Sequence, residues 1–471
     1  MSGSNDVIVV GAGAAGLAAA WRAARRGFKV TLLERSEHVG GMAASFDVAG
    51  IQVDQGSHRL DIRTPHRLLG DVRGMLGEEL QMRWRTSRIR IGDQWLDHPL
   101  RADDVARHLD RRLLAKITKD AMASPLRRAR EETYADVMRA RVGPTLYEAV
   151  YSPFAQKIWG RSGDRLSAVL AGRQADQLRV GKTVGRMLVR AGRRPTPTAI
   201  AGGYYYPRRG FGQLFDALGN AAVDAGVNVQ LEAEVDRVRV FEDEVRVSTQ
   251  DGDEVTGSLV LSTLPLPVLA RLARPAPSLE SMEAAARLRY RAMLLVYVVH
   301  EGGRWTEFDT FDIPDPRTPV SRISEPTNYR DNPDDPVDRS VLCVEIPCSM
   351  TDEVWGLSDE ALGDLVDETL GMCGLPAMNR VHVESRRLAQ VYPIHRAGNE
   401  SDLLDVDSWS RTIRRVVTLG RQGLFVLDNV DQALAMAYDA VESIRDDGSF
   451  DRYAWSVARE RYHRAGSMAR P

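Results

Sequence analysis

The chain has 471 residues, of which 63 are Lys or Arg and 65 are Asp or Glu, so its formal net charge at pH 7 is −2. This balance gives no electrostatic case for a nucleic-acid partner, and the length predicts two or three domains. Hydrophobic residues make up 43% and charged residues 27% of the chain, which is typical of a soluble globular protein.

The sequence also argues against membrane-spanning, secreted, disulfide-bonded and metal-binding classes of protein. The longest apolar run, residues 292–299, is far too short to span a membrane, and Met1–Asn5 lack the pattern of a secretory signal. We therefore expect a cytoplasmic protein without a transmembrane segment. Cys343, Cys348 and Cys373 contain no CxxC pair, and the nine histidines are dispersed. We expect neither a disulfide framework nor a metal site.

The chain opens with a strand, a glycine turn, a helix and a second strand. Residues 6–10 are an apolar, β-branched run, residues 17–26 are rich in helix formers, and residues 28–33 again predict a strand. A GxGxxG pattern joins the first strand to the helix. Its expected cofactor-binding residues are Gly11, Gly13, Ala14, Ala15 and Gly16.

Each part of this unit has a physical role in holding a dinucleotide. Gly11 permits a tight turn, Gly13 lets a pyrophosphate approach the backbone, and Gly16 lets the helix pack closely on the strand. The N-terminus of the helix offers unpaired N–H groups to the phosphates. Glu34, at the end of the second strand, is placed to accept a hydrogen bond from a ribose hydroxyl, and Arg35 beside it joins the predicted cofactor-binding residues.

The next residues favour FAD over NAD. Gly40, Gly41 and Met42 follow the ribose acid closely. Adjacent glycines at this place resemble the stretch of flavoproteins with two dinucleotide-binding domains, in which the chain passes close to the cofactor. An NAD dehydrogenase has no need of such a stretch. The alternative for a Gly-Gly pair is an ordinary loop.

A glycine-centred turn over residues 54–60 carries the first family resemblance. Its pattern Asp54-x-Gly56-x-His58-Arg59 resembles the D-x-G-G-H-R stretch of flavoproteins related to UDP-galactopyranose mutase and protoporphyrinogen oxidase, within the amine-oxidase-like superfamily. The resemblance implies that Gly56, Ser57 and His58 lie against the isoalloxazine. Ser57 stands where a second glycine is usual, and a histidine in a turn is otherwise an ordinary satisfied polar residue.

The resemblance continues to about Val441. It is carried by residues 85–89 with 97–100, 156–160, 204–212, 387–394 and 419–433. It implies substrate contacts from Trp159, Tyr205, Arg208 and Tyr392. It implies cofactor contacts from Val235, Gly420, Arg421, Asn429, Val430 and Asp431. The last segment predicts a strand that leads into a helix N-terminus, which is a sound anion or carbonyl site. The usual glutamate of the second stretch is Gln156 here.

These patterns together predict an α/β fold in three parts. A discontinuous Rossmann-like FAD-binding domain comprises residues 1–95, 201–264 and 396–448. Residues 96–200 are rich in Arg, Ala and Leu at helical spacing and predict a helical insertion. Residues 265–395 predict a substrate domain with a mixed sheet, and residues 449–471 form a C-terminal tail outside the resemblance.

Three functions compete for the predicted flavin site. The first is an FAD-dependent oxidoreductase that moves hydride from a small or glycosylated substrate to flavin N5. The second is a non-redox sugar mutase, in which reduced FAD acts as a nucleophile on a nucleotide sugar and basic residues bind its pyrophosphate. The third is a non-catalytic flavin-binding protein. A small-molecule substrate is expected, and the sequence does not indicate an oligomeric state.

The positions of the lysines and cysteines limit which redox mechanisms are expected. It has no lysine after Lys182 and no cysteine after Cys373, so neither the lysine near N5 of amine oxidases nor the late cysteine that binds flavin covalently in some relatives is expected. A second GxGxxG unit for a nicotinamide is not seen. We hypothesise that His58 takes the proton of a substrate hydroxyl as hydride leaves, with His395 and the predicted tyrosines as other candidates.

Overall fold

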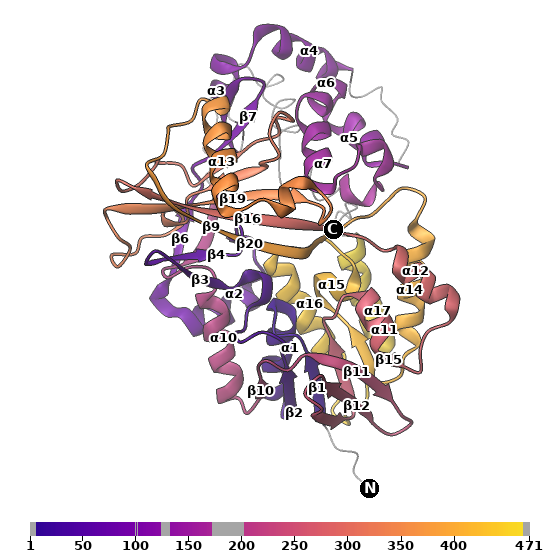
Figure 1. Cartoon of the computed structure of the whole chain (residues 1–471). Helices are drawn as coiled ribbons and strands as arrows, with labels where there is room; N and C mark the ends of the chain where they lie inside the picture. Colours follow the sequence, from indigo (N-terminus) through magenta and orange to yellow (C-terminus); the bar gives the residue numbers. More distant parts are fainter. Residues whose placement is uncertain (1–5, 99, 101, 124–131, 172–201, 465–471) are drawn as a thin grey trace.

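A five-stranded parallel sheet, built from segments far apart in the sequence, forms one end of the molecule (Figure 1). The computed structural model describes residues 6–98, 100, 102–123, 132–171 and 202–464. Across the sheet the strands are β10 (Asn228–Gln230), β2 (Lys29–Leu33), β1 (Asp6–Val10), β14 (Leu259–Ser262) and β21 (Val416–Thr418). Parallel strands require crossover connections, which cover both faces. The predicted Rossmann-like α/β fold is confirmed.

Helices cover one face of this sheet and share its largest hydrophobic core. They are α1 (Ala14–Arg25), α2 (His66–Leu76), α10 (Gln213–Asp224) and α16 (Val430–Glu442). Because α1 is rich in alanine, α10 and α16 can approach it closely. A further helix, α17 (Arg452–Arg464), packs on α16 and buries Trp455, Ala458 and Tyr462. Part of the segment predicted as a tail is therefore an amphipathic helix.

The opposite face of the parallel sheet packs on a four-stranded sheet. Its strands are β13 (Glu254–Gly257), β12 (Val245–Thr249), β11 (Val235–Val240) and β15 (Ala273–Arg274). Ile8 and Val10 of β1 face this second sheet, whereas Val7 and Val9 face the helices. The alternation follows from the period of two along a strand. Four further helices complete this half, namely α11 (Leu266–Leu272), α12 (Leu279–Arg287), α14 (Glu400–Thr412) and α15 (Gly420–Leu424).

A seven-stranded mixed sheet crosses the middle of the molecule (Figure 1). Its order is β20 (Arg380–Pro393), β16 (Tyr290–Glu301), β19 (Arg339–Cys348), β18 (Arg322–Ser324), β17 (Thr310–Asp312), β7 (Ser87–Ile91) and β8 (Gln94–His98). One face of β16 packs under α13 (Asp359–Cys373), and the other packs on the hairpin of β3 (Ser45–Val48) and β4 (Ile51–Asp54). Strand β16 is thus buried on both faces.

The junction between the two sheets differs from the predicted domain bounds. We assigned residues up to 95 to the cofactor domain, but β7 pairs with β17 and β8 pairs with β7, so both strands extend the substrate-side sheet. A three-stranded sheet links the two halves. Its strands are β5 (Leu60–Asp61), β9 (Gly203–Pro207) and β6 (Leu80–Trp84). Strand pairing over these sequence distances leaves no trace in local composition.

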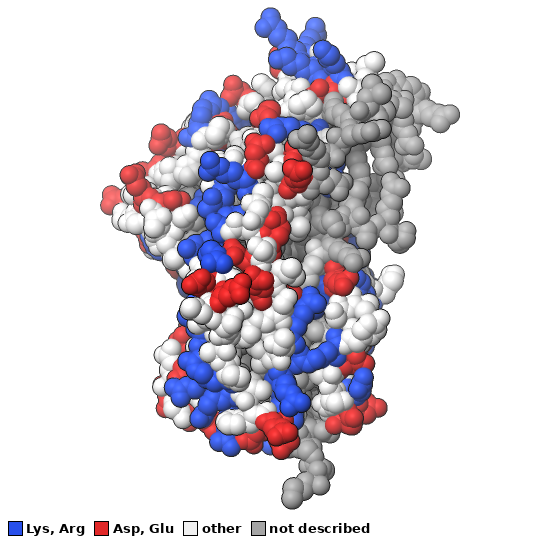
Figure 2. Space-filling view, turned by 90° about the vertical axis from the view of Figure 1, so that its right-hand side faces the viewer, with Lys and Arg blue, Asp and Glu red and all other residues white. Residues whose placement is uncertain are grey.

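Helices cap the far end of the molecule (Figure 1). They are α3 (Ala102–His108), α4 (Arg111–Met122), α5 (Tyr134–Val142), α6 (Pro144–Leu146), the π-helical turn η4 (Tyr147–Tyr151) and α7 (Ser152–Trp159). Figure 2 shows acidic and basic side chains interspersed over one face of the molecule, with Lys and Arg at the end where α4 lies. Among the described residues, no helix combines the length and the apolar character needed to cross a bilayer.

Lys157 ties the helical cap to the seven-stranded sheet. Its Nζ atom donates hydrogen bonds to the carbonyl oxygens of Ile313 (2.7 Å) and Val320 (2.8 Å), and the residue is only 9% exposed. Burial lowers the pKa of this amine to about 7, despite the opposing effect of Asp315. The charged form is therefore costly in the folded protein.

This lowered pKa predicts a pH dependence of stability. Between pH 7 and the ordinary lysine pKa near 10.5, the unfolded chain keeps a proton that the folded chain has released. The contribution of Lys157 to the free energy of unfolding therefore rises with pH across this window, with a slope of up to about 1.4 kcal/mol per pH unit, and is constant below it. Urea unfolding of the wild type and Lys157→Met at pH 7 to 10 measures this slope as the difference between them.

The exposed Lys119, on α4, provides the matched control. Lys119→Met should follow the pH profile of the wild type. Parallel profiles of the wild type and Lys157→Met would contradict the prediction.

Candidate cofactor and substrate site

The glycines around the turn between β1 and α1 differ in what an added side chain would meet. Gly11 has a φ of +94°, and a side chain there would strike Thr263. A Cβ on Gly16 would collide with the carbonyl oxygen of Gly11. Gly13 is different, because it has an ordinary φ of −69° and an added Cβ would meet no atom within 4 Å. The space above Gly13 and the N-terminus of α1 is open, and no side chain caps this helix.

Glu34 lies beside this turn, as the ribose-binding role requires. Its Oε2 accepts a hydrogen bond from the backbone N–H of Ala12 (2.6 Å), and its Oε1 accepts bonds from the N–H (3.0 Å) and hydroxyl (2.8 Å) of Ser36. Arg35 is exposed. The backbone N–H of Ala233 donates to the carbonyl of Glu34 (2.8 Å), so Val235, two residues later, starts its strand near the same edge.

The Gly40–Met42 stretch also returns to the glycine turn. The N–H of Gly40 donates to the carbonyl of Ala12 (2.9 Å), and a Cβ on Gly41 would lie 3.1 Å from the Cα of Gly13. Met42 extends this contact, because its carbonyl oxygen lies 2.8 Å from Nε2 of His58. The stretch therefore connects the predicted phosphate turn to the predicted flavin loop.

A second helix N-terminus reaches the same edge of the sheet. Gly420, with a φ of +78°, opens α15 close to Ala15, because an added Cβ would lie 3.2 Å from that of Ala15. Asn429 caps α16, with Val430 and Asp431 in its first turn. Burial raises the pKa of Asp431. The dipoles at the N-termini of α15 and α16 favour a bound anion or a carbonyl oxygen.

Arg421 is engaged within the protein. Its Nε donates to Oδ1 of Asp428 (2.8 Å), and its Nη2 donates to the carbonyl oxygen of Asp428 (2.6 Å). This pair closes the bend that separates α15 from α16. The other carboxylate oxygen of Asp428 is buried without a partner among the described residues.

The predicted flavin loop, residues 54–59, is anchored at its start by a buried carboxylate. Asp54 accepts hydrogen bonds from the hydroxyl of Ser45 (2.6 Å), the hydroxyl of Tyr206 (2.5 Å) and the backbone N–H of Phe211 (2.9 Å). Its carbonyl oxygen accepts a bond from the Tyr297 hydroxyl (2.6 Å). These donors come from β3, β9, the start of α10 and β16, so four elements determine the position of the loop.

The middle of the loop is held from the substrate-side sheet. The backbone N–H of Ser57 donates to Oε1 of Glu345 (3.0 Å), and its hydroxyl lies 2.6 Å from that of Tyr329. His58 stacks on Phe211, with 5.6 Å between ring centroids. Because both oxygens near its Nε2 are carbonyls, of Met42 and of Gln55 (3.1 Å), this nitrogen must carry the proton.

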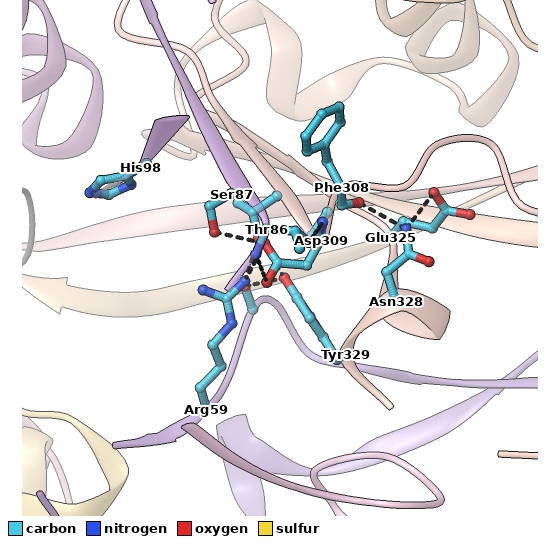
Figure 3. A network of polar contacts seen from close by, with 12 residues as sticks. Arg59, Thr86, Ser87, His98, Phe308, Asp309, Glu325, Asn328 and Tyr329 are labelled. Carbon is cyan, nitrogen blue, oxygen red and sulfur yellow. Dashed lines mark hydrogen bonds and ion pairs between the residues drawn. The ribbon is translucent and has the colours of Figure 1, made fainter. Parts of the chain in front are cut away.

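A buried ion pair ends the loop (Figure 3). Arg59 lies 3.2 Å from Oδ1 of Asp309, which is fully buried. Asp309 also accepts hydrogen bonds from the Ser87 hydroxyl (2.6 Å) and the Thr86 N–H (3.2 Å). The guanidinium lies over the ring of Tyr329 at 4.6 Å. Although burial opposes it, Asp309 raises the pKa of Arg59, so the loop carries a fixed positive charge.

A second charged group lies on the same sheet. Arg322 Nε donates to Asp312 (2.9 Å), and Arg322 Nη1 lies 3.6 Å from Glu345. His98 Nδ1 lies 3.0 Å from the other oxygen of Asp312. Burial alone would raise the pKa of Asp312, but Arg322 and His98 hold it below its ordinary value. Burial and Glu345 raise the pKa of the nearby Tyr392 hydroxyl, which keeps it protonated.

The other three predicted substrate residues lie away from this group. Trp159 is 4% exposed and packs edge-to-face on Tyr134 in the core of the helical cap. Tyr205 accepts a hydrogen bond from exposed Arg73 (2.8 Å), and Arg208 pairs with Glu79 on the outside. Sequence reasoning missed the inward-facing neighbours, since β9 alternates and buries Tyr204 and Tyr206 instead. The substrate contacts of Trp159, Tyr205 and Arg208 stay predictions.

Glu345 was also missed, although the sequence carries a signal for it. It is a single acid inside the apolar strand β19, and charged residues are rarely buried without a partner or a function. The loop contact of Glu345 could not be predicted, because 288 positions separate it from Ser57. Within the described ranges, no group of three or more His, Cys, Asp or Glu side chains could hold a metal ion.

Comparison with known proteins agrees with this geometry. The family described as flavin containing amine oxidoreductase matches residues 14–425. A phytoene dehydrogenase from Streptomyces griseus is 27% identical over 288 residues, which cover 57% of this chain and 56% of that protein. An L-amino-acid oxidase from Naja atra is 44% identical over 81 residues, which cover 17% of this chain and 16% of the oxidase. The chain thus spans about half, or less, of the length of these relatives.

Solved structures share the fold over nearly the whole chain. Reduced UDP-galactopyranose mutase superposes with a TM-score of 0.76 at 18% identity, over 93% of both chains. A protein from Exiguobacterium sp. 255-15, provisionally named a protoporphyrinogen oxidase, gives 0.72 at 21% identity, over 93% of this chain and 98% of that one. Putrescine oxidase bound to putrescine gives 0.64 at 18% identity, over 96% and 98%. At these identities the likeness establishes the fold alone.

The family match over residues 14–425 confirms two predictions made from the sequence, the family resemblance and the FAD cofactor. The open space at Gly13 and the uncapped N-terminus of α1 fit the pyrophosphate of such a cofactor. The chain belongs to the flavin containing amine oxidoreductase family.

Proposed function

We propose that this protein oxidises a small or glycosylated substrate by hydride transfer to N5 of FAD. The observation that carries the proposal is the loop of residues 54–59, which is hydrogen-bonded to both halves of the molecule. Bound FAD supplies the electron-accepting chemistry that no protein side chain offers. The named relatives, a phytoene dehydrogenase and an L-amino-acid oxidase, support a redox reaction.

In this proposal the cofactor is held mainly by backbone and by helix ends. The N–H groups at the start of α1 would bind the pyrophosphate above Gly13. The Glu34 carboxylate would accept a hydrogen bond from a ribose hydroxyl and would give up part of its hydrogen bond with the N–H of Ala12. Gly41 allows the chain to pass close to the cofactor. The first turn of α16, which Asn429 caps, would offer its N–H groups to the flavin.

The substrate-side residues orient the loop. Glu345 fixes the backbone of Ser57, and the ion pair of Arg59 with Asp309 fixes the end of the loop. Because these charges are already paired, they do not need to reorganise when a substrate binds. Tyr392, with its protonated hydroxyl, is the predicted substrate residue that lies beside this group.

His58 is the proposed proton acceptor, and the structure limits how it can act. Nε2 donates to the carbonyl of Met42, so only Nδ1 has a free lone pair for a substrate proton. A base at this place would take the proton from the substrate's hydroxyl oxygen, while hydride leaves the carbon that bears this hydroxyl group.

The mutase alternative has less support from the charged residues. A nucleotide sugar would need free basic side chains for its pyrophosphate, and Arg208, Arg209 and Arg421 are the arginines that would suit it. Arg208 and Arg209 lie near Glu79 instead, at 3.3 and 3.6 Å, and Arg421 is paired with Asp428. Redox chemistry therefore stays ahead of mutase chemistry.

The deciding experiment uses the flavin itself. Purified protein is reduced anaerobically with dithionite and tested with UDP-galactose and UDP-galactofuranose, and its flavin spectrum is recorded. We expect no interconversion, and reoxidation of the reduced flavin by oxygen or an artificial acceptor. Interconversion that requires reduced flavin would establish the mutase instead. A flavin that neither reoxidises nor supports interconversion would indicate a binding protein.

Gly13→Ala separates cofactor binding from folding. The added methyl meets no protein atom within 4 Å, so the free energy of unfolding of the apoprotein should change by less than about 1 kcal/mol. The same methyl enters the space proposed for the pyrophosphate, so FAD affinity should fall at least tenfold. Fluorescence titration of apoprotein with FAD measures the affinity.

Gly74→Ala is the matched control for this variant. Gly74 lies on the exposed side of α2, where an added Cβ also meets no atom within 4 Å. FAD affinity should be unchanged in this variant. Equal affinity of Gly13→Ala and the wild type would place the pyrophosphate elsewhere.

His58→Gln tests the proposed base. A glutamine can still donate a hydrogen bond to the carbonyl of Met42, but it offers no basic nitrogen. FAD content should be retained and turnover should fall at least a hundredfold. Stopped-flow reduction of the flavin by substrate measures the chemical step. Unchanged turnover would remove His58 from the mechanism.

A further inference from the structure

Arg85 is linked through Asp309 to the predicted flavin loop, residues 54–59. It forms the turn between β6 and β7, where its backbone N–H donates to the carbonyl of Gly202 (2.8 Å). The next two residues, Thr86 and Ser87, both donate hydrogen bonds to Asp309, the partner of Arg59 (Figure 3). The turn that carries Arg85 is thus fastened to the end of the loop that begins at Asp54. The Arg85 side chain is partly exposed, so a ligand can reach it.

The acids around Arg85 are engaged by other groups. Asp309 is taken by Arg59 and by the two residues after Arg85. Asp312 is taken by His98 and Arg322. Asp61, whose low pKa Arg85 also favours, pairs with Arg63. The charges of Arg59 and Arg322 are therefore balanced within the protein.

Arg85 is only partly balanced, by the more distant charges of Asp309 and Asp312. Over the part of the chain that the structure describes, its guanidinium makes no hydrogen bond and no ion pair. A guanidinium has five N–H donors, and leaving them unpaired in a poorly solvated place is costly. Consistent with this, burial together with Arg59 lowers the pKa of Arg85 to about 10, whereas that of the paired Arg59 is raised. Arg85 still carries its charge at neutral pH.

We propose that Arg85 binds an oxyanion of the substrate, a carboxylate or a phosphate group, beside the cofactor. This inference rests on the proposed function and names the substrate class for the same site. A bidentate contact with an oxyanion satisfies the free donors and restores charge balance. A cationic amine, such as the putrescine bound in one structural neighbour, would place a second positive charge next to Arg85. The substrate is therefore an acid rather than a simple amine.

The test measures binding of three probes that differ only in their charged group. Benzoate, phenyl phosphate and benzylamine are titrated into the FAD-loaded protein, and the change in flavin absorbance gives each dissociation constant. We expect at least one anion to bind at least tenfold more tightly than benzylamine. A preference for phenyl phosphate assigns a phosphate group, and a preference for benzoate assigns a carboxylate.

Variants then assign the preference to Arg85. Arg85→Gln should weaken binding of the preferred anion at least tenfold, and Arg85→Lys should retain part of it. Arg339→Gln removes a charge from an exposed arginine paired with Asp338 and should change nothing. If Arg85→Gln does not fold, Arg85→Lys and the preference of the wild type still decide the matter.

Two results would overturn the inference. If all three probes bind equally well, or if the Arg85 variants keep the full anion preference, Arg85 is not the anion site, although the FAD-dependent function stands. If the protein does not take up FAD at all, the proposed function fails and this inference fails with it.

Discussion

The geometry of this site depends on one buried carboxylate, that of Asp54. Its side chain and carbonyl collect donors from four elements, among them Tyr206 of β9 and Tyr297 of β16. A buried donor that loses its partner costs about 1–3 kcal/mol, so displacing this residue would strand several groups at once. The loop that follows Asp54 can therefore take one position between the parallel sheet and the mixed sheet. The proposed base, His58, lies on that loop, and the buried pair of Arg59 with Asp309 ends it.

The two halves hold their partners by different physical means. On the cofactor side, glycine turns and two helix N-termini present backbone groups, which need no side-chain charge. On the substrate side, the loop is held by Glu345 and by the buried pair of Arg59 with Asp309. Burying such pairs adds little net stability, because desolvation offsets their attraction. These pairs serve to hold the loop in position. Arg85 is then the charged side chain with which a ligand can pair.

Local patterns were enough to predict much of the fold. The unit around Gly11 folds within thirty residues, since its turn, helix and two strands contact one another directly. The same holds for the helix capped by Asn429 and for α13, which Ser358 caps. The FAD cofactor followed from these segments because backbone N–H groups and glycines bind phosphates wherever such a turn forms. The family resemblance extended this prediction over most of the chain.

By itself the sequence determined the cofactor fold and the family, and tertiary structure decided which side chains meet at the site. Strand register placed Tyr204 inward and Tyr205 outward, and pairing of β7 with β17 brought Arg85 beside the loop of Arg59. The tertiary structure also placed Glu345 of β19 within hydrogen-bonding distance of that loop. Helical and turn preferences act over a few neighbouring residues, whereas strand pairing and buried charge pairs join positions hundreds of residues apart. Those contacts exist only in the folded chain.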